Sequence, residues 1–357
     1  MRLLHAADFG GVAPGGFIPM ILAIARRVRA RGDEFALVVP RAEGATWYPA
    51  ARAAGAELHV VRDGFEAARV ARAWRADVAH VHFFGWEIPV TLALWPSRCR
   101  IVWHAHSTSA RDGRVHRTAA AFVKYRLAGA RVARFVAVSH AVADEIALLG
   151  APRARIAVLH NAIDATRFVP PSALERAAAR GALGLGANDR AILFFGRDPV
   201  LKGADVLAEA LAREPLGAER ELAIVSVATP DGARGALARH ARVVDVARAD
   251  DVVPLLWACD ALAVPSRGEG FGLVLVEALA TGLPVAASDL AALREAAAGD
   301  PAVRFAAPGE ADALAGALGA ALAAGRGDGR GSAERITLDQ WAERLDALYG
   351  EIGARSV

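Results

Sequence analysis

Two glutamates, Glu269 and Glu277, stand on either side of a glycine-rich turn and an apolar run. An apolar segment over 261–265 precedes them, and the run over 273–281 ends at Gly282. This order predicts a strand, a loop and a short buried helix. A glycine-rich loop that opens a helix presents unpaired backbone N–H groups, which stabilise negative charge. Because ligands bind at the carboxyl ends of parallel strands, we expect Glu269 to face a ligand crevice, with Glu277 farther along the helix.

The sequence of this segment is Glu-Gly-Phe-Gly-Leu-Val-Leu-Val-Glu. It closely resembles the E-x7-E motif of the retaining GT-B glycosyltransferases, the family called glycosyl transferases group 1. The resemblance implies that Glu269 and the backbone of Gly270, Phe271 and Gly272 hold hydroxyls of the donor sugar. It also implies that Glu277 binds the ribose hydroxyls of the nucleotide. The alternative interpretation is that the glycine-rich loop is only a tight connection and that both glutamates are solvated.

The segment Phe-Gly-Arg-Asp-Pro-Val-Leu-Lys-Gly over 195–203 resembles the family's GR…KG motif, in which an arginine and a lysine grip the nucleotide diphosphate. Here these residues are Arg197 and Lys202. Of the 42 basic residues, the lysines are Lys124 and Lys202 alone, so a lysine is an unusual choice in this chain. A compact ammonium suits a phosphate oxygen, and a departing diphosphate develops negative charge that fixed cations stabilise. A solvated lysine is the alternative, and we expect Asp198 to turn away from the anion or to hold Arg197.

Two histidines, His104 and His106, end the predicted strand over 100–106, and the alternation of a strand places both side chains on one face. The family commonly has a histidine at the end of this strand, near the primary hydroxyl and the reacting centre of the donor sugar. The resemblance therefore implies that His106 assists there, while a structural and a functional role both remain open for His104. We predict that His82, Trp86 and His104 line the acceptor pocket, with ordinary core packing as the alternative.

A glycine pair, Gly15-Gly16, stands where the family carries two glycines between the first strand and the first helix. The missing side chains let the backbone approach a donor phosphate or an acceptor, although a tight turn would need glycine too. The chain departs from the family pattern after the middle strand of the predicted donor domain, where Val225-Ser226-Val227 stands in place of a glycine.

Short apolar strand patterns alternate with helical patterns along the chain, which predicts an α/β protein with doubly wound parallel sheets. The alternation pauses between 168 and 190, so we predict a first Rossmann-like domain over 1–168 and a second over 169–336. An amphipathic helix within 337–357 is predicted to cross back to the first domain. The resemblance implies the GT-B architecture, in which the two domains face each other across a cleft, the first binding the acceptor and the second the donor. The predicted strands cover 2–7, 34–40, 57–62, 77–82, 100–106, 134–139 and 155–160, then 191–195, 221–227, 242–246, 260–264 and 284–288.

The composition limits the kinds of protein that this chain can be. With 357 residues, 54 % of them apolar, it is too long for one compact core of usual size. Cys99 and Cys259 have no metal or disulfide spacing, so buried free thiols are expected. Neither a membrane span nor a signal peptide is evident, which predicts a cytoplasmic protein. The basic segment over 111–134 allows a peripheral contact with the inner membrane face, a solvated helix being the alternative, and no motif supports nucleic acid binding.

The sequence therefore predicts a retaining glycosyltransferase that moves a sugar from a nucleotide diphosphate donor, most simply a UDP-sugar, to a hydroxyl of a small-molecule, saccharide or lipid-linked acceptor. The resemblance implies same-face attack, in which the leaving phosphate oxygen accepts the acceptor's proton, with Glu269 as a covalent nucleophile as the alternative. We predict no metal and no cofactor, because no Asp-x-Asp pair ends a strand. A GT-B epimerase or phosphorylase and a non-catalytic nucleotide-sugar binding protein are the rival functions.

Overall fold

The computed structural model describes residues 1–83, 85–107, 119–213, 221–329 and 337–354. Their contacts divide the chain into two compact units. The first unit comprises the described residues up to 162 together with 337–354, and the second comprises those from 163 to 329. The division thus precedes the predicted boundary at 168 by six residues. Within the intervening residues, the guanidinium of Arg167 pairs with Asp251 of the second unit at 2.6 Å.

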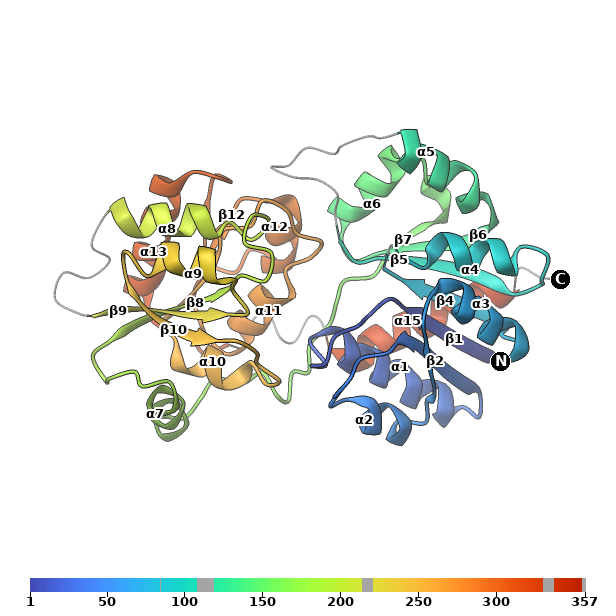
Figure 1. Ribbon diagram of the computed structural model, residues 1–357, viewed down its shortest axis with the longest axis horizontal. Coiled ribbons are helices and arrows are strands. Elements are labelled where there is room, and N and C mark those ends of the chain that lie inside the picture. The colour runs from blue at the N-terminus through green and yellow to red at the C-terminus, as the bar shows by residue number, and fades with distance from the viewer. Residues whose placement is uncertain (84, 108–118, 214–220, 330–336, 355–357) are drawn as a thin grey trace. The chain divides into compact units, whose positions relative to one another are not determined.

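The first unit is built on a parallel sheet in the order β3-β2-β1-β4-β5-β6-β7 (Figure 1). The order reverses between β1 and β4, which is the switch point at which doubly wound sheets bind ligands. The elements of this unit are β1 (Arg2–Ala7), α1 (Phe17–Ala30), β2 (Glu34–Pro40), α2 (Tyr48–Ala53), β3 (Glu57–Val61), α3 (Gly64–Ala73), β4 (Val78–His82), α4 (Glu87–Leu94), β5 (Arg100–Ala105), α5 (Ala119–Arg126), η1 (Ala128–Arg131), β6 (Val132–Ala137), α6 (His140–Leu148), η2 (Arg153–Arg155), β7 (Ile156–Val158) and α15 (Leu338–Ala354).

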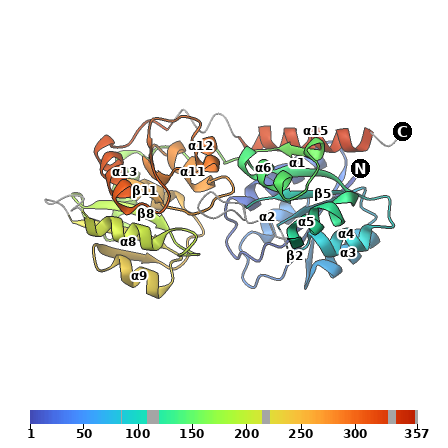
Figure 2. The ribbon, with the colours of Figure 1, turned by 90° about the horizontal axis from the view of Figure 1, so that it is seen from above.

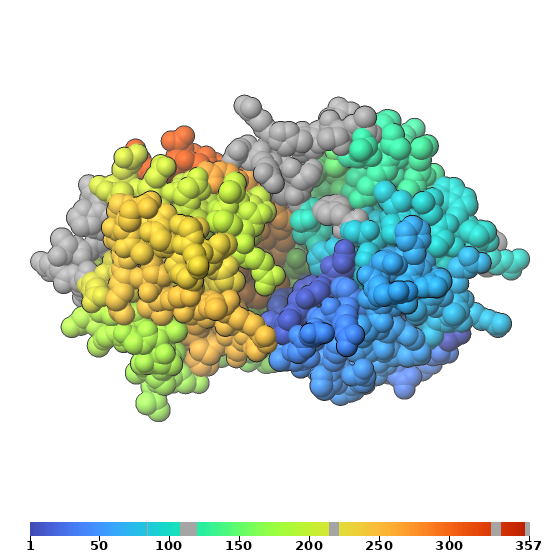
Figure 3. Space-filling view, viewed as in Figure 1, coloured from blue at the N-terminus to red at the C-terminus, as the bar shows by residue number. Residues whose placement is uncertain are grey.

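The second unit is built on a parallel sheet in the order β10-β9-β8-β11-β12-β13. Viewed as in Figure 1, side chains of the yellow α9 and β10 region form part of its near surface (Figure 3). Its elements are α7 (Ala173–Ala182), β8 (Arg190–Phe195), α8 (Ala204–Arg213), β9 (Leu222–Val227), α9 (Asp231–Leu237), β10 (Arg242–Val246), α10 (Val253–Ala258), β11 (Ala261–Val264), α11 (Leu273–Ala280), β12 (Val285–Ser288), α12 (Ala291–Ala297), β13 (Val303–Ala306) and α13 (Ala311–Ala324).

The last described helix, α15, returns to the first unit and packs on the same face of its sheet as α1, whereas α3, α4 and α5 cover the other face (Figure 2). Trp341, Leu345 and Tyr349 of α15 are buried in the core that α1 helps to form, because their spacing puts them on one side of the helix. Arg27 of α1 also donates to the carboxylate of Asp346 at 3.1 Å. This helix confirms the predicted crossing back to the first domain.

The alternation of the sequence predicted the fold class correctly, and two details were wrong. The strand β13 (Val303–Ala306) was not predicted, because it is four residues long and Arg304 interrupts its apolar pattern. The strand predicted over 134–139 is β6 (Val132–Ala137), since Arg134 lies within the strand and reaches Glu351 at 3.1 Å instead of marking the strand's start. Both cysteines are buried free thiols, as expected. Among the described helices, none is both long and apolar enough to cross a bilayer.

Candidate active site

The two motifs of the second unit lie side by side because their strands are neighbours. β8 and β11 pair in parallel, with Ala261 opposite Ile192, so the loops that follow them leave the same edge of the sheet. The backbone N–H of Arg267, in the loop after β11, donates to the carbonyl of Leu201, in the loop after β8, at 2.8 Å. The guanidinium of Arg267 adds a bond to the carbonyl of Val200 at 2.8 Å. The two loops therefore form one hydrogen-bonded surface.

Arg267 is a residue that the sequence analysis missed. Its guanidinium donates to both carboxylate oxygens of Asp205 at 2.7 Å, a bidentate pair that joins the loop after β11 to the first turn of α8. The hydrogen bonds from Arg267 lower the pKa of Asp205. No spacing in the sequence signals this pair, because its partners are 62 residues apart.

Lys202 and Glu269, predicted to bind different parts of one ligand, are in direct contact. The Nζ of Lys202 donates to Oε1 of Glu269 at 2.5 Å, and the hydroxyl of Ser266 donates to the same oxygen at 2.8 Å. The Glu269 side chain is 11 % exposed and that of Lys202 is 30 % exposed. An ammonium has three N–H bonds, so Lys202 can keep this contact and still donate to a phosphate.

One glycine of each motif is required by the backbone. Gly203 has φ 69°, and a Cβ there would lie 2.0 Å from the carbonyl oxygen of Pro265. Gly272 has φ 90° and caps α11, and a Cβ there would lie 2.4 Å from Leu293. Phe271 is 2 % exposed, so only its backbone is available for the predicted contact with a sugar. The glycine spacing thus allows the close approach of the two loops and the opening of α11.

Arg197 is exposed and makes no ion pair or hydrogen bond with the residues that the structure describes. Its guanidinium is therefore available to an anion at the loop that also carries Lys202. One expectation was that Asp198 holds Arg197, but the described residues show no ion pair between them. Instead the carboxylate of Asp198 accepts the backbone N–H of Leu201 at 3.1 Å, because a short turn here leaves that donor without another partner.

Glu277 lies one and a half turns into α11 and is buried. Burial raises the pKa of its carboxyl group to about 8, and the charge of Arg167 offsets part of this rise. At neutral pH most of this carboxyl group is protonated in the unliganded protein. It can then both donate and accept a hydrogen bond.

The predicted residues of the first unit fall into two groups. Gly15 has φ 53°, which favours glycine, whereas Gly16, the N-cap of α1, has φ −77°, which any residue adopts. Trp86 is 5 % exposed, and its ring lies 3.2 Å from where a Cβ of Gly64 would stand. Its ring is therefore packed against α3. Its contact with an acceptor stays a prediction.

The three other candidates, His82, His104 and His106, belong to a larger group of histidines. His5 of β1 pairs in register with His80 of β4, and His82 pairs with His104 of β5. The rings of His104 and His106 stack with centroids 4.1 Å apart, which confirms that they share a face. We call the five residues the histidine cluster. His82 and His104 are completely buried within it, so an acceptor contact by either stays a prediction.

The histidine cluster is uncharged at neutral pH. Burial lowers the pKa of His5 and of His106 to about 3. Burial, and next the charges of the other rings, hold the pKa values of His80, His82 and His104 well below the ordinary range. His5 was missed by the sequence analysis, although its position in the first strand faces the same side as the others.

Two sets within the histidine cluster have the residue types of a metal site. The ligand atoms of His5, His80 and His82 lie within 4.8 Å of one another, as do those of His82, His104 and His106. Both ring nitrogens of His82 are engaged in hydrogen bonds between rings. Nε2 lies 2.9 Å from Nδ1 of His5, and Nδ1 lies 2.9 Å from Nε2 of His106. These bonds explain why the nitrogens are close together without a metal. The absence of a metal requirement stays a prediction.

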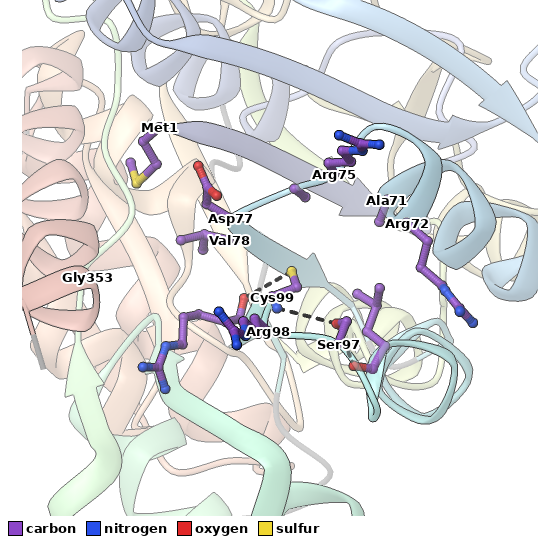
Figure 4. A pocket seen from close by; sticks show the side chains of 13 residues that line it. Met1, Ala71, Arg72, Arg75, Asp77, Val78, Ser97, Arg98, Cys99 and Gly353 are labelled. Carbon is purple, nitrogen blue, oxygen red and sulfur yellow. Dashed lines mark hydrogen bonds between the residues drawn. The ribbon is translucent and has the colours of Figure 1, made fainter. Parts of the chain in front are cut away.

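A cavity of about 650 Å³ opens at the other edge of the first sheet (Figure 4). Met1, Asp77 and Cys99 line it and stand just before β1, β4 and β5. It thus lies at the amino ends of these strands, away from the edge at which parallel sheets bind their ligands.

The basic segment over 111–134 is described from 119 onward, and residues 111–118 lie outside the described part. Lys124 pairs with the buried carboxylate of Glu87. Arg131 donates to the carbonyls of Ser97 and Cys99, at 2.7 and 2.8 Å. These two cations serve the fold, so peripheral membrane contact through this segment stays a prediction.

Comparison with known families gives two matches that together cover most of the chain. Residues 189–324 match the family described as Glycosyl transferases group 1, and residues 14–167 match Glycosyltransferase Family 4. D-inositol 3-phosphate glycosyltransferase of Mycolicibacterium vanbaalenii is 35 % identical over 176 residues, or 43 % of this chain and 37 % of that protein. The enzyme of the same name from Nocardia farcinica is 36 % identical over 170 residues, which is 42 % of this chain and 36 % of that protein. The matched part thus spans little more than a third of these relatives.

Solved structures show the same fold over the whole chain. Anabaena Alr3699/HepE in complex with UDP-glucose matches with a TM-score of 0.78 and 19 % identity, covering 98 % of this chain and all of that one. Sucrose-phosphate synthase of Thermosynechococcus elongatus matches with a TM-score of 0.74 and 18 % identity, covering both chains completely. Two Rossmann-like units of the GT-B type are therefore the fold of this protein.

Proposed function

We propose that this chain, which belongs to the glycosyl transferases group 1 family of GT-B proteins, transfers a sugar from a nucleotide diphosphate to an acceptor hydroxyl with retention of the anomeric configuration. The observation that carries the proposal is the contact between Lys202 and Glu269, which joins the diphosphate motif to the sugar motif at one sheet edge. UDP is the simplest donor nucleotide, since the similar Anabaena protein was solved with UDP and with UDP-glucose.

Each part of the donor has a partner in this arrangement. The free N–H bonds of Lys202 and the guanidinium of Arg197 neutralise the leaving diphosphate, aided by the N–H groups that open α11. Glu269 accepts hydroxyls of the sugar, and Glu277 binds the ribose. The acceptor oxygen bonds to the anomeric carbon as the bond to the phosphate oxygen breaks, and that oxygen takes the acceptor's proton. Lys202 and Ser266 both donate to Oε1 of Glu269, which leaves Oε2 to accept a hydroxyl of the sugar.

A screen of UDP-, GDP-, ADP- and TDP-sugars tests the proposal in two steps. A donor at 100 times its dissociation constant stabilises the protein by about 2.7 kcal/mol, which a thermal melt detects. The donors that bind are then incubated without acceptor, and slow release of nucleoside diphosphate is expected. Binding without release would indicate a sensor, an altered nucleotide sugar would indicate an epimerase, and no binding would contradict the proposal.

Donor turnover is expected to persist in EDTA. Lys202 and Arg197 supply the positive charge that a metal would otherwise bring to the diphosphate. The measurement is nucleoside diphosphate release by chelator-treated protein, with and without added manganese. Activity that disappears in chelator and returns with manganese would contradict the proposed stabilisation of the leaving group.

The two glutamates are expected to respond differently to neutral substitution. Glu277→Gln should weaken the binding of bare nucleoside diphosphate by about 1.5–3 kcal/mol at pH 8.5, because hydrogen bonds to a charged carboxylate are lost. In the unchanged protein the affinity should fall as the pH drops below about 8, since the charged carboxylate accepts from ribose with both oxygens and more strongly than the protonated group does. Glu269→Gln should keep nucleotide affinity and lower turnover, because its partner is the sugar.

Calorimetric titrations between pH 6.5 and 8.5, paired with rates on the full donor, measure this contrast. Glu277→Gln should flatten the pH dependence of affinity, and Glu269→Gln should preserve it. An equal loss of nucleotide affinity in both variants would show that the carboxylates do not divide the sugar from the ribose.

A further inference from the structure

The histidine cluster contains an unbroken chain of hydrogen bonds. The hydroxyl of Tyr349, on α15, lies 2.8 Å from Nε2 of His5 and 2.5 Å from Nδ1 of His80. Nδ1 of His5 lies 2.9 Å from Nε2 of His82, and Nδ1 of His82 lies 2.9 Å from Nε2 of His106. Both ring nitrogens of His5 and of His82 are therefore engaged, and the chain runs from α15 to the end of β5.

Each member of this chain has one proton to give. A neutral imidazole has one donor nitrogen and one acceptor nitrogen, and the lowered pKa values keep these rings neutral. Burial raises the pKa of Tyr349 well above its usual value, so its hydroxyl keeps its proton. When Tyr349 donates to one ring and accepts from the other, so that its own buried proton has a partner, the direction of one hydrogen bond fixes the direction of all the others. Either His80, His5, His82 and His106 all carry the proton on Nδ1, or all four carry it on Nε2.

The buried end of the chain distinguishes the two arrangements. Nε2 of His80 has no hydrogen-bond partner among the described residues and is inaccessible to solvent. With protons on Nδ1, this atom is an unpaired acceptor, and with protons on Nε2 it is an unpaired N–H. In protein backbones a buried N–H without a partner is rarer than a buried acceptor without one, and we apply that preference to the ring nitrogens. The arrangement with all four protons on Nδ1 is therefore the favoured one.

We infer that Tyr349, His5 and His82 are positioning residues that hold His106 as its Nδ1–H tautomer. His106 accepts at Nε2 from His82 and is left with an N–H donor at the nitrogen outside the chain. Two aromatic rings hold the imidazole of His106 in place. The ring of Phe83 stacks on it with centroids 4.5 Å apart, and the ring of Phe17 meets it edge-on with centroids 5.5 Å apart. The role of that donor toward a sugar oxygen rests on the proposed function, whereas the tautomer itself does not.

Tautomers can be read directly by NMR in the absence of any substrate. Protein labelled with 15N-histidine is examined at pH 8 by long-range 1H–15N correlation, which separates protonated from unprotonated ring nitrogens, and single substitutions assign the ten histidines. The expected spectrum shows all four rings of the chain protonated at Nδ1. Protonation of all four at Nε2, or a mixture of the two forms among them, would overturn the inference.

A matched pair of variants tests the coupling. His82→Phe divides the chain, so His106 should lose its single tautomer. His104→Phe removes a ring that stacks on His106 but makes no hydrogen bond with the described residues, so all four tautomers should persist. If His82→Phe leaves His106 unchanged, the chain does not set its tautomer. Stoichiometric zinc bound to His82, His104 and His106 in the purified protein would also overturn the inference.

The kinetic consequence separates this inference from the proposed function. His82→Phe should lower kcat about fivefold with little change in nucleotide affinity, the size expected for one neutral hydrogen bond of ~1 kcal/mol. If the expected tautomers are found but the protein releases no nucleotide from any sugar donor, the inference about the hydrogen-bond chain holds and the proposed enzymatic function is wrong. Active transfer with a mixed pattern would do the reverse.

Discussion

At pH 5.5 the first unit is expected to lose about 5–6 kcal/mol of its free energy of unfolding, which is comparable to the whole stability of many domains. Four completely buried imidazoles, those of His5, His80, His82 and His104, are the cause, and the half-buried His106, whose pKa is also lowered, adds to the loss. Their pKa values are far below 6.5 in the folded state, so the folded protein does not take up protons there. The unfolded chain does. Each histidine therefore costs about 1.4 kcal/mol one pH unit below its unfolded pKa of ~6.5.

The sign of this effect follows from proton uptake. Because the folded pKa values are lowered, the stability is complete above about pH 6.5 and falls as the pH drops from there toward about 3. Denaturant titrations at half-unit steps from pH 8 to 5 should show unfolding coupled to the uptake of about four to five protons, the fifth being that of His106. Tryptophan fluorescence is a suitable signal, since six of the seven tryptophans belong to the first unit and Trp257 alone to the second.

His104→Phe is the control for this prediction. It replaces one buried ring by an apolar ring of similar size, so the slope of stability against pH should decrease by about 1.4 kcal/mol per pH unit. The stability at pH 8 should change little or rise, because both ring nitrogens of His104 lack partners among the described residues. A stability that does not vary between pH 8 and 5.5 would mean that these histidines are not buried as neutral rings.

The fold was predictable because alternation in the sequence is strong. β1, β2 and β10 begin and end at the predicted residues. β13 could not be predicted, since a strand of four residues that contains an arginine has too short an apolar pattern to be recognised. Strand order along the sheet is a property of packing, which the sequence pattern alone does not reveal.

The candidate site was predictable in its members and not in its contacts. Lys202 and Glu269 were recognised separately, and their contact depends on the pairing of β8 with β11. The chain from Tyr349 to His106 could not be predicted, because its first contact joins residues 344 positions apart and requires α15 to lie on one particular face of the sheet. Periodicity predicts which side of a helix is buried, but it does not predict which residue that side meets.

Lys202→Ala is expected to reduce donor turnover about 100- to 1,000-fold, a loss of ~2.7–4 kcal/mol that matches removal of one preorganised charge-stabilising donor. The side chain is 30 % exposed and paired only through its tip, so the stability of the protein should change by less than about 1 kcal/mol. Rates at saturating donor, together with denaturant titration, measure the two effects separately.

The other lysine of the chain is a natural control. Lys124 pairs with Glu87, a buried carboxyl group whose pKa burial raises to about 7 even beside the ammonium. Lys124→Ala leaves that group without its partner and should cost about 1–3 kcal/mol of stability, while turnover per folded molecule stays near the original rate. The two lysines thus predict opposite outcomes, one catalytic and one structural. If Lys202→Ala keeps the original rate with every donor and instead loses stability, its contact with Glu269 holds the loops together and the diphosphate lies elsewhere.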